Sequence, residues 1–180
     1  MTTVKERIAA LRACMKEKRI DAYLIPTDDY HASEYVGEFF KCRAYMTGFT
    51  GSAGTAVITQ NMAGMWTDAR YFIQAERQMG ENVTLFKMRE PGVPTVEEFL
   101  KDTLKEGDCL GFDGRCVGAS EAEKLVKELG EKGVRVDSGE DLVGEIWTDR
   151  PALSSEPAWE LDLKWAGKSR EDKIAEIYLK

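Results

Sequence analysis

The stretch TAVITQNMAGMWTDARYFIQAERQM, residues 55–79, contains two short apolar runs and then changes to helical spacing. The two runs, over residues 55–59 and 63–67, are separated by a polar turn around Gln60-Asn61. Apolar runs of this length joined by a short polar turn predict a β-hairpin. We therefore expect two adjacent antiparallel strands at this point in the chain.

The residues after the hairpin predict a helix. Asp68 is a favourable N-cap residue, and the predicted helix runs over Arg70 to about Met79. A strand that leads into a helix is the unit from which α/β folds are built.

Strand and helix patterns also alternate in the rest of the chain. Thr3, Thr95 and Ser120 are each followed three residues later by Glu, which is the spacing of a capping box and predicts three helix starts. The predicted elements are a helix over about 4–18, a strand over 22–25, an irregular loop over 27–43, a strand over 83–88, a helix from 95, a strand over 109–112, a helix from 120 with Leu125, Val126 and Leu129 inward, and a strand over 134–136. This alternation predicts an α/β domain in which a mixed β-sheet is flanked by helices on both faces.

The end of the chain differs from the part before it. Residues 151–157 contain two prolines and two serines, and Ser169 then begins a new amphipathic helix. We expect residues 1–152 to form one domain, 153–168 a linker and 169–180 the truncated start of a following domain. The natural protein is thus expected to continue.

Composition and charge exclude several classes of protein. The 180 residues are 43% hydrophobic and 32% charged, with a formal net charge of −7, which argues against nucleic acid as the main partner. No apolar run approaches the roughly 18 to 20 residues that cross a bilayer. The first residues mix charged and apolar groups, unlike a secretory signal. These features predict a cytoplasmic protein with neither nucleic acid nor membrane as a partner.

The cysteines and the single histidine offer little for metal chemistry. The cysteines have no paired spacing, so free thiols are favoured over disulfides. They are Cys14, Cys42, Cys109 and Cys116. His31 lies close to Asp28, Asp29 and Glu34, so a carboxylate–histidine site is one interpretation. An exposed loop histidine is the favoured one.

The glycine cluster GFTGSAGT, residues 48–55, is the first candidate for ligand binding. Glycine-rich turns expose backbone N–H groups that can cradle phosphate. This cluster has the spacing of neither known phosphate-binding motif, and it leads into a strand. Ser52 lacks the sequence context of a nucleophile elbow in a chain with one histidine. A tight structural turn is therefore favoured.

Arg70 is the stronger candidate, since it lies where a predicted strand gives way to a helix. Open α/β sheets present ligand-binding groups at such positions. A cation in the first turn of a helix opposes the helix dipole by about 0.3 kcal/mol or more. We expect its guanidinium to face a carboxylate, either within the fold or on a ligand.

Four motifs carry a family resemblance. They are DAYLIPTDDYHASEY (21–35), RAYMTGFTGSAGT (43–55), WTDARYFIQAERQM (66–79) and DLVGEIWTDRP (141–151). In this order they resemble the amino-terminal domain of Xaa-Pro aminopeptidases, the creatinase/prolidase amino-terminal domain, and above all its long three-domain cytosolic form. The resemblance implies an α/β mixed-sheet domain with a ribonuclease H-like fold.

The resemblance also implies an activity for the complete protein. Members release the first residue from peptides whose second residue is proline, usually with two Mn²⁺ ions. The ions are held by two aspartates, a histidine and two glutamates of a carboxy-terminal domain that is not part of these 180 residues. The chain is thus expected to be non-catalytic and to hold no cofactor. Its implied partners are its own catalytic domain, a proline-containing peptide and a second copy in a homodimer.

In the long form of this family the arginine of the WTD-x-R motif is implicated in substrate contact, and it corresponds to Arg70. The glycine usually found before that arginine is Ala69 here, which puts close approach of substrate to this backbone in doubt. Two alternatives stay open, because a fold does not set the chemistry. One is a free-standing binding module of the same fold, and the other is a relative that acts on a non-peptide substrate.

Overall fold

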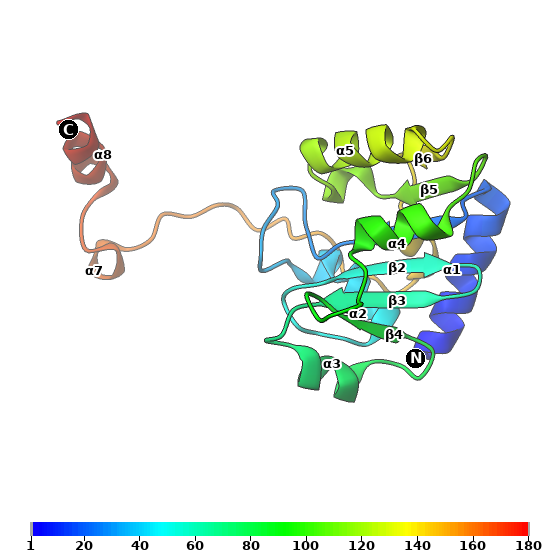
Figure 1. Cartoon of the computed structure of the whole chain (residues 1–180). Coiled ribbons are helices and arrows are strands. Elements are labelled where there is room, and N and C mark those ends of the chain that lie inside the picture. The colour runs from blue at the N-terminus through cyan, green and yellow to red at the C-terminus, as the bar shows by residue number, and fades with distance from the viewer. Residues whose placement is uncertain (1, 180) are drawn as a thin grey trace.

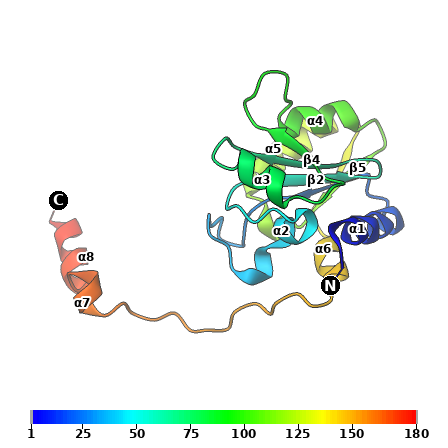
Figure 2. The same ribbon diagram turned by 90° about the horizontal axis from the view of Figure 1, so that it is seen from below.

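In the computed structural model, which describes residues 2–179, a six-stranded sheet has helices packed on both faces (Figures 1 and 2). The elements are α1 (Val4–Lys18), β1 (Ala22–Ile25), η1 (Glu38–Phe40), α2 (Cys42–Thr47), β2 (Thr55–Thr59), β3 (Ala63–Thr67), α3 (Phe72–Gln78), β4 (Thr84–Lys87), α4 (Val96–Thr103), β5 (Cys109–Phe112), η2 (Gly114–Cys116), α5 (Ala119–Gly130), β6 (Arg135–Asp137), α6 (Leu142–Ile146), α7 (Leu163–Ala166) and α8 (Arg170–Tyr178). None of the helices in this described range is long and apolar enough to cross a membrane.

The sheet has the strand order β4-β3-β2-β1-β5-β6. The strand β2 is antiparallel to both of its neighbours, β1 and β3, whereas the pairs β3–β4, β1–β5 and β5–β6 are parallel. The predicted hairpin and the predicted mixed sheet are therefore confirmed. All strands except β2 point their carboxyl ends at the same edge of the sheet, and β2 begins at that edge.

Alternating side chains along the strands form two apolar clusters, one on each face of the sheet. On one face, Tyr23 and Ile25 of β1 pack with helices α1, α2 and α6. The helix residues buried there are Ile8, Leu11, Met15, Met46, Leu142 and Val143. On the other face, Leu24 packs with Leu100 of α4 and with α5. Figure 2 shows α4 on one side of the sheet and α1 and α6 on the other.

Two of the three predicted capping boxes are confirmed, at Thr3 and Thr95. The third is wrong, because α5 begins at Ala119 with Gly118 as its N-cap and no side-chain cap bond. The inward position predicted for Val126 is also wrong, since this side chain is 53% exposed. Leu125 and Leu129 are four residues apart, so they share one helix face, and both are buried as predicted. Val126 follows Leu125 directly, and because each residue turns the helix by about 100°, its side chain points away from that buried face.

Several short elements were not predicted from the sequence. The region expected to be irregular over 27–43 contains η1 and the start of α2, and the expected linker contains α7. These helices are one or two turns long, so they are too short to show a helical period. The helix α2 ends at Gly48, whose φ of 81° is left-handed and favours glycine.

The four cysteines are free thiols, as predicted. Cys109 is buried, and the other three are half-buried.

The last part of the chain leaves the sheet domain. Residues 151–162 have no regular structure and lead away to α7 and α8 (Figure 1). The predicted helix start at Ser169 is confirmed, because its side chain accepts a hydrogen bond from the Asp172 N–H. Large apolar side chains in this segment are exposed, namely Leu153, Trp159, Leu161, Leu163, Trp165, Ile174, Ile177, Tyr178 and Leu179.

Candidate functional site

Three loops meet at the edge of the sheet where β1 and β3 end and β2 begins. They are residues 26–37 after β1, residues 48–54 before β2 and residues 68–71 after β3. The carboxyl ends of parallel strands are the usual place for ligand sites in open α/β sheets. This edge is therefore the candidate site.

The glycine loop before β2 is closely packed. A Cβ on Gly51 would lie 2.2 Å from Phe49 Cζ and 2.8 Å from Tyr71 Cδ1. Gly54 has a φ of +151°, and a Cβ there would lie 2.6 Å from the Trp66 carbonyl oxygen. These contacts explain the glycines without a phosphate and support the interpretation of the cluster as a structural turn.

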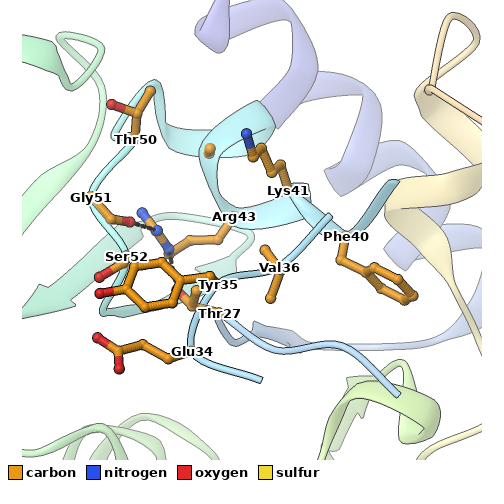
Figure 3. A pocket seen from close by; sticks show the side chains of 11 residues that line it. Thr27, Glu34, Tyr35, Val36, Phe40, Lys41, Arg43, Thr50, Gly51 and Ser52 are labelled. Carbon is orange, nitrogen blue, oxygen red and sulfur yellow. Dashed lines mark hydrogen bonds between the residues drawn. The ribbon is translucent and has the colours of Figure 1, made fainter. Parts of the chain in front are cut away.

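A pocket of about 260 Å³ opens between this loop, α2 and the loop after β1 (Figure 3). Its lining residues are Thr27, Glu34, Tyr35, Val36, Phe40, Lys41, Arg43, Ala44, Thr50, Gly51 and Ser52. The Ser52 hydroxyl lies 2.7 Å from the Tyr71 hydroxyl, which joins the pocket wall to the turn that carries Arg70.

Arg43 holds the wall of this pocket together. It is 4% exposed, and its guanidinium donates to Thr27 Oγ1 at 2.6 Å, to the Phe49 carbonyl at 2.9 Å and to the Gly51 carbonyl. In Figure 3 the guanidinium points toward Gly51 and Thr27. Sequence reasoning missed this residue, since it lies in a region expected to be irregular and two of its acceptors are backbone carbonyls.

The structure places Arg70 before the helix, not within it. The helix α3 begins at Phe72 with Tyr71 as its N-cap, so the predicted cap at Asp68 is wrong. The Asp68 carboxylate instead accepts the Arg70 backbone N–H at 3.0 Å, and Tyr71 N–H bonds to the Asp68 carbonyl. Aspartate side chains stabilise such turns in competition with helix. Arg70 therefore lies outside the first turn of α3, where the helix dipole would have opposed its charge.

Arg70 does face a carboxylate, and that carboxylate lies within the fold. Its Nε lies 2.9 Å from Asp68 Oδ1 and its Nη2 lies 2.8 Å from Asp68 Oδ2. These hydrogen bonds hold the pKa of Asp68 below its usual value and raise that of Arg70. Glu34 on the pocket wall also contributes to raising the pKa of Arg70. The Arg70 side chain is 64% exposed, so a further acceptor can reach it.

His31 is an exposed loop residue, the interpretation favoured from the sequence. Its backbone N–H donates to Asp29 Oδ1 at 2.8 Å. Among residues 2–179, no group of three or more His, Cys, Asp or Glu side chains is placed to hold a metal ion.

The motif over residues 141–151 packs the last part of the domain against α2 and η1. Arg150 donates to Asp141 Oδ2 at 2.6 Å and to the Phe39 carbonyl at 2.8 Å, and its guanidinium lies 3.7 Å from the centre of the Phe39 ring. Trp147 stacks on Tyr45 with ring centroids 4.3 Å apart. These contacts attach the chain to α2 and η1 before it leaves the domain.

Residues 7–146 match the creatinase/prolidase N-terminal domain family. A probable Xaa-Pro aminopeptidase P from Laccaria bicolor is 42% identical over 174 residues, which cover 96% of this chain and 27% of that relative. Aminopeptidase P2 from Arabidopsis thaliana is 40% identical over 179 residues, which cover 97% of this chain and 25% of that relative. The chain thus spans about a quarter of the length of these relatives.

Solved structures agree with the sequence match. The X-prolyl aminopeptidase from Caenorhabditis elegans, described as a cytosolic enzyme with a di-nuclear active site, has a TM-score of 0.86 and 32% identity. The match covers 98% of this chain and 31% of that one. An Xaa-Pro aminopeptidase from Streptococcus pyogenes has a TM-score of 0.59 and 26% identity over 79% of this chain. This chain therefore belongs to the creatinase/prolidase N-terminal domain family, and relatives that match nearly its whole length are named as Xaa-Pro aminopeptidases.

Proposed function

We infer that this chain is the amino-terminal, non-catalytic domain of a cytoplasmic Xaa-Pro aminopeptidase, which releases the first residue from peptides with proline in second place. One observation carries this inference. Relatives named as Xaa-Pro aminopeptidases match 96% of this chain with about a quarter of their own length. Most of each relative, with room for the catalytic machinery, lies outside the matched part.

The metal chemistry is assigned to that other part. The C. elegans relative is described as having a di-nuclear active site, which supports a pair of divalent metal ions, such as Mn²⁺, in a carboxy-terminal domain. Metal ions of this kind activate water for attack on a scissile carbonyl. This chain's contribution is to wall the substrate cleft and to support a homodimer.

The domain division follows from the same inference. Residues 1–152 form the cleft wall, 153–168 are the linker, and 169–180 begin a second domain. The exposed apolar side chains of α8, including Ile174 and Ile177, support this division, because large apolar patches rarely stay uncovered in soluble proteins.

Arg70 is the residue we assign to substrate contact. Its guanidinium is exposed on a turn at the carboxyl edge of the sheet, and Asp68 holds it in place through two hydrogen bonds. Such an arrangement presents the remaining N–H groups to a backbone carbonyl or a carboxylate of a bound peptide.

Replacing Arg70 with alanine in the intact protein is expected to lower kcat/KM for Ala-Pro-Ala by about 10- to 100-fold, since a charge-assisted hydrogen bond contributes about 1.5–3 kcal/mol. The free energy of unfolding should change by less than about 1 kcal/mol, because the ion pair is exposed. Steady-state peptide cleavage and urea unfolding measure the two effects.

Arg77→Ala is the matched control, since Arg77 is an exposed arginine on the neighbouring helix α3. Its kcat/KM should stay within about twofold of the parent value. An Arg70→Ala enzyme with unchanged kcat/KM would remove Arg70 from the substrate site.

A further inference from the structure

The pocket beside the Arg70 turn contains a buried positive charge. Arg43 is 4% exposed, and all three acceptors of its guanidinium are neutral, namely the Thr27 hydroxyl and the carbonyls of Phe49 and Gly51. Buried charges in proteins are ordinarily paired with an opposite charge.

No Asp or Glu of residues 2–179 lies within ion-pair distance of the Arg43 guanidinium. Burial lowers the pKa of Arg43 to about 10, and the one group that acts in the opposite direction is the hydroxyl of Tyr71. The positive charge is thus uncompensated by any carboxylate in the described part of the chain.

The guanidinium has donors left for another acceptor. Of the five N–H groups of an arginine, three are used here, so each terminal nitrogen keeps one N–H. Ser52 also lines the pocket, and its hydroxyl shares one hydrogen bond with the Tyr71 hydroxyl behind it, which leaves one hydroxyl proton to donate elsewhere. Together these groups form a donor set suited to a carboxylate.

The other charged residues that line the pocket, Lys41 and Glu34, do not neutralise the positive charge of the Arg43 guanidinium. Lys41 is paired with Glu38 on the surface. Glu34 is exposed, and its charge raises the pKa of Arg70 and not that of Arg43. The pocket volume of about 260 Å³ exceeds what one or two ordered waters need.

We propose that this pocket, which Arg43 and Ser52 both line, binds the carboxylate of a peptide. Given the function proposed above, that group is the carboxy-terminal carboxylate of a short peptide substrate that passes Arg70. The site adds a substrate preference to the proposed function, because an enzyme with this pocket would cleave short peptides with a free carboxyl end in preference to others.

The test uses this chain, whose sheet and both apolar clusters lie within residues 2–147, and a pair of peptides that differ only at the carboxyl end. Ala-Pro-Ala and its carboxy-terminal amide are titrated into the ¹⁵N-labelled chain. The acid is expected to shift the amide resonances of Thr27, Gly51 and Ser52, and the amide peptide to bind at least about tenfold more weakly. Equal binding of both peptides, or no shift at these residues with either, would overturn the proposal.

Two variants locate the binding. Ala44→Leu fills the pocket and leaves the side-chain bonds of Arg43 in place, so it should abolish the shifts caused by the acid. Arg43→Lys keeps a cation without the planar fork and should weaken the acid at least about fivefold. Since Arg43 variants can fail to fold, Ala44→Leu is decisive, and its dispersed spectrum serves as the folding control. Retained binding of the acid by folded Ala44→Leu would exclude this pocket.

Cleavage by the intact protein separates this proposal from the function on which it rests. A preference of at least about tenfold in kcat/KM for Ala-Pro-Ala over its amide supports both. Equal cleavage of the two peptides leaves the peptidase function standing and overturns the carboxylate site. If the intact protein cleaves neither peptide and the chain still distinguishes acid from amide, the function is wrong and the carboxylate site stands.

Discussion

Replacing Trp66 with alanine is expected to lower the free energy of unfolding by about 3–5 kcal/mol, the range for truncating a large buried aromatic side chain. Trp66 lies on β3 inside the sheet and is fully buried. Its ring stacks on Phe86 with centroids 4.1 Å apart, and its Nε1–H donates to the Pro94 carbonyl at 2.8 Å. Removal of the ring leaves a cavity and an unpaired carbonyl. Urea unfolding measures the change.

Trp66→Phe is the matched control for the hydrogen bond. It keeps an aromatic ring against Phe86 and loses the bond to Pro94, so a smaller loss of about 1–2 kcal/mol is expected. If Trp66→Ala unfolds within about 1 kcal/mol of the parent protein, the assignment of Trp66 to the core is contradicted.

Arg150→Met is expected to lower the free energy of unfolding by about 2–3 kcal/mol, because loss of the guanidinium leaves the partly buried Asp141 without its closest cation. The Arg150 side chain is 10% exposed and also donates to the Phe39 carbonyl. A Cβ on Gly144 would lie 2.7 Å from Arg150 Nη1, which shows how closely the backbone packs on this guanidinium. The free energy is again measured by urea unfolding.

The control is Arg115→Met, which removes the other arginine that contacts Asp141. Arg115 is 55% exposed and lies 3.2 Å from the same carboxylate oxygen, so its loss should cost less than about 1 kcal/mol. An equal loss in the free energy of unfolding for the two variants would contradict the view that Arg150 anchors the 141–151 segment to the domain.

Local patterns predicted most of this fold. The β-hairpin and the capping boxes at Thr3 and Thr95 were predicted because each depends on residues close together in sequence. Two local predictions were wrong for physical reasons. Asp68 stabilises a turn in competition with a helix start, and α5 begins before Ser120, at Ala119.

The candidate site was less predictable. Arg70 was singled out by its position at the end of a strand and by the family resemblance, and its contact with substrate remains a prediction. Arg43 could not be found from local patterns, because its partners come from the loop after β1 and from the glycine loop. Only the folded chain brings these segments together.

The measurement that tests the central claim most directly is cleavage of Ala-Pro-Ala in the presence of Mn²⁺, by this chain alone and by the intact natural protein that contains it. The intact protein is expected to release alanine, and the chain alone is expected to release none. Release of alanine by the pure chain would contradict its assignment as a non-catalytic domain. An intact protein that cleaves no peptide with proline in second place would contradict the proposed peptidase function.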